Sequence, residues 1–136
     1  MGLDLFVRKE RDFRQENGRQ CYTVETVTNL RKCHRTLELM DQDLDNGFDN
    51  CSTHNFYGDF FVEAVKQLKA EKEAYDKKDI SLKYTFTDET DEKFAERCEE
   101  KSKDLAYEIE KLEDLIKEEN LKEGDFDNIY EVHAWW

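Results

Sequence analysis

The longest regular hydrophobic pattern in the chain lies between Thr87 and Leu121. Apolar or small residues recur there at alternating intervals of three and four, which places them on one face of a helix. They are Ala95, Cys98, Ser102, Leu105, Ile109, Leu112 and Ile116. Asp and Glu fill many of the other positions, and Gly124 follows the run as a helix terminator. The pattern predicts one long amphipathic helix over residues 88–121.

Two other stretches also show helical spacing of hydrophobic residues. The first, over residues 24–44, includes Val27, Leu30, Leu37, Met40 and Leu44, and the second, over residues 59–77, includes Phe61, Val65, Leu68 and Tyr75. Between them, residues 45–58 are rich in Asn, Asp, Ser and Gly, a composition that is typical of loops. We therefore expect two helices that are separated by an irregular segment.

Apolar and polar residues alternate in three other segments, which is the pattern of half-buried β-strands. A fourth strand would follow Asn17-Gly18, a dipeptide that favours a tight hairpin turn. The predicted strands lie near residues 2–8, 20–24, 80–86 and 129–135. Because strands and helices do not strictly alternate, the pattern predicts an α+β fold with a small, mainly antiparallel sheet packed against three helices. Residues 1–136 are expected to form a single domain, with the two terminal strands close together.

Composition adds a strong and uneven negative charge. The chain of 136 residues has a net charge of −13, and residues 88–127 hold seventeen acidic residues against seven basic ones. Phosphate contact needs Lys and Arg, so the bulk field excludes direct nucleic-acid binding and favours a protein partner with a basic surface. The candidate docking residues lie on the outer faces of the predicted long helix and are Glu96, Glu100, Asp104, Glu110, Asp114 and Glu118.

A basic cluster stands out against this acidic background. It consists of Arg31, Lys32, His34 and Arg35 on the first predicted helix, with Arg31 and Arg35 on one face. A guanidinium group matches the geometry of phosphate, so the cluster is a candidate site for an anionic small ligand such as a nucleotide. The alternative interpretation is that these side chains pair with the acidic long helix of the same chain.

Residues 41–47 resemble the opening of an EF-hand calcium loop, because Asp recurs there at alternate positions. The glycine and the bidentate glutamate of such a loop are missing, since their positions hold Asn46 and Ser52. An acidic helix end followed by an Asx-Gly turn explains the stretch better. We therefore expect no calcium site.

Cysteine and histidine form two further groups. Cys33-His34 and Cys51-x-x-His54 supply two thiols and two imidazoles, but neighbouring side chains on a helix diverge by about 100°. Cys51 and His54 are also the only close pair that matches a nucleophile and its base. A buried Cys33 beside a surface His34 is the simpler interpretation. We expect no catalytic site, no metal and no cofactor.

The chain shows neither a signal peptide nor a membrane span by pattern. Its start has no basic segment followed by an apolar run, and no stretch approaches the roughly 18 apolar residues that cross a bilayer. Four cysteines without an export signal are typical of free thiols in a reducing compartment. The expected location is the cytoplasm, without membrane contact.

The opening Met1-Gly2-Leu3-Asp4-Leu5-Phe6 is similar to a group of small bacteriophage and prophage proteins of unassigned function that begin Met-Gly-Leu-Asp-Met-Tyr-Leu. Other features of that group occur here in the same order: Arg31-Lys32, Cys51 before Phe56-Tyr57, the Thr87–Asp91 stretch and Trp135-Trp136. The histidine that follows an aromatic residue in the group is missing, and Leu37 stands about where it would lie. The resemblance implies a phage accessory protein acting in a bacterial cytoplasm, and it carries no catalytic residues.

Charge and resemblance together lead to three hypotheses. The first is a binding protein that inhibits a host defence or nucleic-acid-processing protein by occupying its basic groove, as anti-CRISPR proteins that mimic nucleic acid do. The second is a small-ligand binder, such as a nucleotide-signal sponge, which uses the basic cluster. The third is a small enzyme of unrecognised type. A homodimer is compatible with each of them.

Overall fold

The computed structural model describes residues 2–136. Along the chain, the elements are β1 (Asp4–Glu16), β2 (Arg19–Asn29), α1 (His34–Asp43), β3 (Thr53–Tyr57), α2 (Gly58–Asp76), the short 3-10 helix η1 (Ile80–Leu82), α3 (Asp91–Glu119) and β4 (Ile129–Trp135). The four strands form one antiparallel sheet in the order β2-β1-β4-β3. The predicted α+β class with a small antiparallel sheet and three helices is confirmed.

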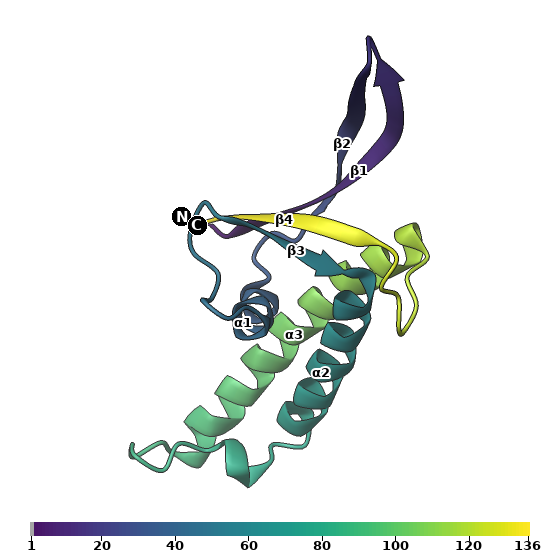
Figure 1. Ribbon diagram of the computed structural model, residues 1–136. Helices are drawn as coiled ribbons and strands as arrows, with labels where there is room; N and C mark the ends of the chain where they lie inside the picture. Colours follow the sequence, from purple (N-terminus) through teal and green to yellow (C-terminus); the bar gives the residue numbers. More distant parts are fainter. Residues whose placement is uncertain (1) are drawn as a thin grey trace.

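All three α-helices lie on one face of the sheet (Figure 1). The alternation of the two terminal strands explains this arrangement, because every second side chain is buried in β4 and in the first part of β1, where Leu5 and Val7 are buried. The sheet contributes Leu5, Val7, Phe56, Tyr130, Val132 and Ala134 to the core, together with Leu3 just before β1, and the helices contribute Met40, Phe61, Leu68, Leu105, Leu112 and Leu115. Within residues 2–136, the opposite face of the sheet carries no helix (Figure 1).

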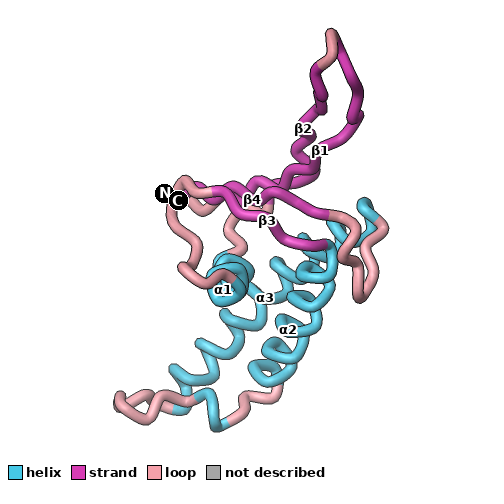
Figure 2. The backbone as a smooth tube through the Cα atoms, viewed as in Figure 1, coloured by secondary structure: helices cyan, strands magenta, loops and turns pink. Residues whose placement is uncertain are grey.

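The first and last strands of the chain lie side by side. β1 pairs with β4, with Leu5 opposite Ala134 and Val7 opposite Val132. Both chain ends therefore meet at one end of the sheet (Figure 2). The predicted strand at 129–135 and its position next to the N-terminal strand are confirmed.

The hairpin formed by β1 and β2 extends well beyond the rest of the sheet. The β1–β4 ladder ends where Arg8 lies opposite Glu131, whereas β1 and β2 remain paired to Glu16 and Arg19. The part beyond the sheet, residues 9–25, is here called the hairpin arm, and it projects away from the helices (Figure 2). Its Asn17-Gly18 turn is confirmed, since both residues have positive φ angles of 51° and 75°. The predicted end of the first strand near residue 8 is wrong, because β1 continues to Glu16. The predicted second strand near 20–24 exists and starts within one residue of the prediction, but it continues to Asn29.

The prediction of a helix over residues 24–44 is wrong in about its first half. β2 continues to Asn29, and α1 begins only at His34. Residues 22–28 contain one tyrosine and five β-branched residues, which favour an extended backbone when a partner strand is available. β1 supplies that partner, so pairing along the hairpin overrides the helical spacing of Val27 and Leu30.

Two predictions about connecting segments are also wrong. Residues 45–58 are not wholly irregular, because Thr53–Tyr57 forms β3 and pairs with β4. The predicted strand over 80–86 does not exist: η1 occupies Ile80–Leu82, and no strand follows before α3. This segment joins α2 to α3 at the end of the helices that is farthest from the sheet, so no strand is within reach to pair with it (Figure 1).

The two long helices follow their sequence patterns closely. α2 starts and ends within one residue of the predicted range 59–77, and α3 begins three residues later and ends two earlier than predicted. Thr90 is the N-cap of α3, its hydroxyl oxygen accepting from the Lys93 amide at 3.2 Å, and Asn120 ends the helix with a φ of 52°. No helix within residues 2–136 is long and apolar enough to cross a membrane.

Candidate functional site

The six predicted docking residues share the outer surface of α3. Glu96, Glu100, Asp104, Glu110, Asp114 and Glu118 are all exposed. At about 100° per residue they fall within a sector of roughly 120°. The buried residues of α3, which include Leu105, Leu112 and Leu115, lie on the opposite side of the helix. We call these six residues the acidic face.

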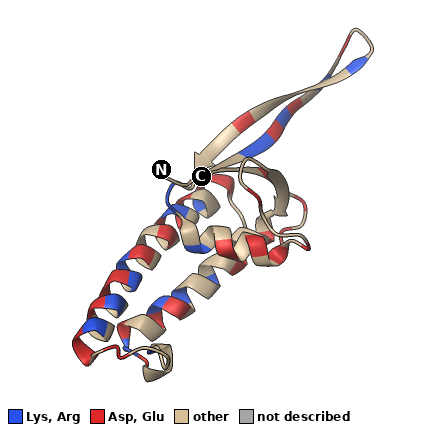
Figure 3. Ribbon diagram, turned by 90° about the vertical axis from the view of Figure 1, so that its left-hand side faces the viewer, with Lys and Arg blue, Asp and Glu red and all other residues tan. Residues whose placement is uncertain are grey.

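None of the six carboxylates of the acidic face takes part in an ion pair within residues 2–136. Acidic residues on the flanks of α3 behave differently, since Glu113 pairs with Lys69 of α2 at 2.7 Å. Lys93, Lys103 and Lys111 share the sector of the acidic face, so its charge is mixed but mostly negative. Figure 3 shows the same alternation of red and blue along the helices.

The basic cluster does not form one surface. Because α1 begins at His34, Arg31 lies before the helix, and the prediction that Arg31 and Arg35 share a helix face is wrong. Arg31 is exposed and lies 3.9 Å from the carboxylate of Asp4. Arg35 instead turns toward α2, where Nε and Nη2 donate to the two carboxylate oxygens of Glu71 at 2.8 and 3.2 Å.

The hydrogen bonds to Glu71 raise the pKa of the Arg35 guanidinium above its ordinary value. A further bond from Nη1 of Arg35 to Glu38 at 2.8 Å occupies the remaining side of the same group. The arginine best placed to hold a phosphate is therefore already bound within the chain. This outcome matches the alternative interpretation of the cluster, with α2 rather than α3 as the acidic partner.

A cleft of about 780 Å³ lies between α1, α2 and α3. Three residues of the predicted basic cluster line it, namely Lys32, His34 and Arg35. The other charged lining residues are Lys101, Glu38, Glu71, Asp104 and Glu108. Acidic side chains thus balance or exceed the basic ones, which does not favour a simple anion site.

Glu108 lies at the wall of this cleft and is the most deeply buried charged residue of the core, with 3% of its surface exposed. Its carboxylate accepts hydrogen bonds from the amide and hydroxyl of Thr36, both at 2.8 Å, and from the amide of Arg35 at 3.3 Å. These amides belong to the first turn of α1, and Cys33 at its N-cap offers no side-chain cap. Glu108 of α3 therefore caps α1.

Burial raises the pKa of Glu108 above its ordinary value, and the hydrogen bonds from Thr36 and Arg35 oppose that rise in part. Sequence reasoning assigned no role to this residue. The signal was nevertheless available, because Glu108 stands three residues after Leu105 and four before Leu112. Both intervals place it on the buried side of the helix.

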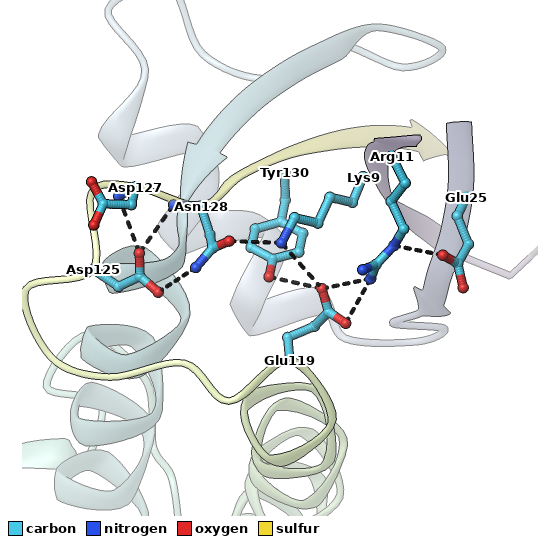
Figure 4. A network of polar contacts seen from close by, with 8 residues as sticks. All are labelled: Lys9, Arg11, Glu25, Glu119, Asp125, Asp127, Asn128 and Tyr130. Atoms are coloured by element: carbon cyan, nitrogen blue, oxygen red, sulfur yellow. Dashed lines mark hydrogen bonds and ion pairs between the residues drawn. The ribbon is translucent and has the colours of Figure 1, made fainter. Parts of the chain in front are cut away.

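A second polar network joins the base of the hairpin arm to the end of α3 (Figure 4). The carboxylate of Glu119 accepts from Nη2 of Arg11 at 2.8 and 2.9 Å and from the hydroxyl of the buried Tyr130 at 2.9 Å. Nζ of Lys9 adds a contact to the same carboxylate at 3.8 Å and a hydrogen bond to Asn128 at 2.6 Å. The network fixes the direction in which the arm leaves the sheet.

Comparison with known proteins assigns no family. No protein-family model matches the chain, and neither a curated protein nor a solved structure matches it. The resemblance of the opening residues to phage proteins therefore stays a prediction.

The predicted cysteine and histidine groups are not brought together as a site. The ring of His54 packs edge-on against Phe48 at 4.7 Å, whereas Sγ of Cys51 lies 3.6 Å from the side-chain oxygen of Asn50. Cys33 is buried in the core, and all four cysteines are free thiols. Across residues 2–136, no group of three His, Cys, Asp or Glu side chains is placed to hold a metal ion.

Proposed function

We propose that this protein acts by binding, and that the acidic face of α3 docks on a basic surface of another protein. The observation that carries the proposal is the contrast along α3 between paired and unpaired carboxylates. Glu113, on the flank, is satisfied by a lysine of α2, whereas the six outer carboxylates have no ion pair within the described chain. They are thus available to a partner at no cost of breaking contacts within the protein.

The charge of the acidic face supports a role in the approach of a partner as well as in the contacts of the complex. Carboxylates on one helix repel each other, so such a face carries a cost in folding free energy that packing must offset. A partner with a basic groove would relieve that repulsion, and opposite charge would speed and orient its approach. The lysines within the sector, such as Lys103 and Lys111, add positions at which acidic residues of the partner's rim would be recognised.

The similarity of the opening residues to phage proteins favours a particular class of partner, a protein of the bacterial host. A phage accessory protein acts in the cytoplasm of its bacterial host, and host proteins that process or cut nucleic acid present basic grooves for phosphate. The specific form of the proposal is an inhibitor that occupies such a groove in a defence or nucleic-acid-processing protein. The inhibitor would then compete with nucleic acid for the groove.

The test is capture from a bacterial lysate with three forms of the protein. The first form is the parent, and the second carries Glu100→Gln, Glu110→Gln and Asp114→Asn, which avoid Asp104 because it also lines the cleft. The third carries Asp43→Asn, Asp45→Asn and Asp49→Asn, which remove the same charge near the end of α1 and in the loop that follows. We call the second form the α3 variant and the third form the α1 variant. We expect the parent and the α1 variant to capture a nucleic-acid-binding protein from the lysate, and the α3 variant to lose it. Equal capture by all three forms would contradict the proposal.

The second candidate function is binding of a small ligand in the cleft beside α1. The observation in its favour is the cleft's volume of about 780 Å³, which falls within the common range for ligand pockets. Its mixed lining favours a zwitterionic ligand over a simple anion. Thermal shifts measured with nucleotides and amino acids would test this function, with Lys101→Ala expected to abolish any shift.

A further inference from the structure

The outer edge of β2 is unpaired along the hairpin arm. β2 is the end strand of the sheet, and it runs for 11 residues without proline. Edge strands of soluble proteins are usually short or protected by lysine, proline or a covering segment, because a free edge pairs readily with another chain. β2 has none of these protections between Arg19 and Thr26. The edge is therefore competent to pair.

The arm also exposes an apolar cluster. Phe13, Tyr22 and Val24 are exposed to 72%, 50% and 48%, and the rings of Phe13 and Tyr22 lie 5.9 Å apart. No helix lies under this part of the hairpin (Figure 2). A two-stranded ribbon with no packing partner is marginally stable in water, and additional strands stabilise it. A further strand would therefore both pair with the free edge of β2 and cover part of the exposed apolar cluster.

The charges of β2 indicate which strand fits. β2 carries only two charged residues, Arg19 and Glu25, six positions apart. When two β2 strands pair antiparallel with Tyr22 opposite Tyr22 of the second copy, each Arg19 lies opposite a Glu25. A shift of two residues in either direction places Arg19 opposite Thr23 or Val27 instead. In this register, the two copies therefore form two opposite-charge pairs, each between Arg19 of one copy and Glu25 of the other.

The shape of β2 selects the same register. The strand follows the Asn17-Gly18 turn, and its ladder with β1 is interrupted at two places. At Val27 the extra residue belongs to β2, whereas opposite Tyr22 the extra residue belongs to β1, between Arg11 and Arg14. β2 itself therefore has no extra residue from Arg19 to Thr26, and Tyr22 lies near the middle of that stretch. Arg19 has no ion pair within residues 2–136, whereas Glu25 lies 2.5 Å from Nε of Arg11. Pairing would give Arg19 a carboxylate and would place Glu25 between two guanidinium groups.

We propose that two copies of this chain associate through the β2 edges of their arms, antiparallel and centred on Tyr22. The two arms then form a four-stranded ribbon whose exposed face joins the Phe13, Tyr22 and Val24 side chains of both copies. The helical bodies lie at opposite ends of this ribbon, so both acidic faces remain open. The dimer is independent of the proposed docking on α3.

Charge reversal tests the interface. Glu25→Arg also removes the ion pair of Glu25 with Arg11 at the base of the arm, so the mixture of the two variants described below is its control. Arg19→Glu places two carboxylates opposite each other at both ends of the pairing, and Glu25→Arg does the same with two guanidinium groups. We expect the parent to be a dimer in analytical ultracentrifugation and each variant to dimerise at least about tenfold more weakly. An equimolar mixture of the two variants restores both opposite-charge pairs and should form a heterodimer. Arg14→Glu, on β1 of the same arm, is the control that should leave dimerisation unchanged.

Cross-linking tests the register. In a Cys21→Ser, Cys51→Ser background, Tyr22→Cys should be linked to its copy by a short bis-maleimide, and Gln20→Cys should not, because its opposite residue is Val24. Three results would overturn the proposal: a parent that stays monomeric at its highest soluble concentration, a dimer that both charge variants keep, or a mixture that remains monomeric. Equal cross-linking at positions 20 and 22 would overturn the register.

Discussion

The carboxylate of Glu108 accepts hydrogen bonds from both the backbone amide and the hydroxyl of Thr36, each at 2.8 Å. The two residues are 72 positions apart, and Thr36 is itself fully buried. The pair holds the first turn of α1 against the middle of α3. A charged side chain from one helix thus satisfies the amides that another helix leaves unpaired at its N-terminus.

Replacement of Glu108 should change stability in a pH-dependent way. Because burial raises the folded-state pKa of Glu108, the folded protein binds a proton more tightly than the unfolded chain does. The contribution of Glu108 to stability is therefore largest near and below pH 4.5, its ordinary pKa, and falls as pH rises toward the folded-state value. Glu108→Gln keeps an acceptor for Thr36 but does not ionise. Its stability relative to the parent should increase from pH 4.5 upward, measured as the difference in urea midpoint.

Glu108→Ala removes the acceptor and leaves the Thr36 amide and hydroxyl buried without a partner. We expect a loss of about 2–4 kcal/mol in unfolding free energy, from the orphaned donors and the cavity together. Glu110→Ala, on the exposed side of the same helix, is the matched control and should change stability by less than about 0.5 kcal/mol. For Glu108→Gln, the result that would contradict the raised pKa of Glu108 is a difference in urea midpoint from the parent that does not change with pH.

The hydroxyl of Tyr130 should stabilise the junction of arm and helix. It donates to Glu119 at 2.9 Å from a fully buried position, so Tyr130→Phe should cost about 1–3 kcal/mol in unfolding free energy. Burial and the adjacent Glu119 carboxylate also raise the pKa of Tyr130, so the parent should lose more stability than the variant does as pH rises above about 10. Urea unfolding measures both effects. Tyr57→Phe, at an exposed tyrosine, should show neither of them.

The last strand should be essential for folding. β4 lies between β1 and β3, and its Tyr130, Val132 and Ala134 are fully buried. Deletion of residues 130–136 splits the sheet into a hairpin and an isolated strand, so we expect no cooperative thermal transition. Deletion of Trp136 alone removes an exposed residue and should leave the transition in place. A truncated protein that melts at the parent's temperature would show that the sheet does not depend on β4.

Sequence patterns predicted well the start of β1, the last strand β4 and the two long helices. Leu3, just before β1, and Leu5 and Val7 within it alternate because one face of the strand is buried, and Phe61, Val65 and Leu68 follow helical spacing because one side of α2 is buried. The spacing of such residues along the chain indicates which side of the strand or helix is buried. The α+β class, both long helices and the adjacency of the terminal strands followed from them.

The errors occurred where pairing with a distant segment decides the structure. Residues 24–29 show some helical spacing, but pairing with β1 makes them part of a strand, and residues 53–57 become a strand only because β4 lies beside them. Ile80, Tyr84 and Phe86 alternate like a strand, yet they lie at the far end of the helices and remain exposed. The hydrophobic periodicity of one segment does not indicate whether a partner strand will lie beside it in the folded protein.

The candidate site was predictable in part for a similar reason. The exposure of the acidic face followed from the position of the buried stripe of α3, since both are set by one helical period. Whether each carboxylate finds a cation depends on the neighbouring helix, as the contact of Glu113 with Lys69 shows. The capture of Arg35 by Glu71 and the buried cap formed by Glu108 likewise depend on how α1 packs against α2 and α3.

The central claim is that the acidic face of α3 docks on a basic partner. Its most direct test is the association rate of the purified protein with the captured partner, measured by stopped-flow from about 50 to 300 mM salt. Charges on such a surface are screened beyond about 10 Å at 0.1 M ionic strength, so the parent's rate should fall steeply over this range. The α3 variant should associate more slowly at low salt and show a flatter dependence, while the α1 variant should behave like the parent. Equal rates and equal salt dependence for the parent and the α3 variant would contradict the account.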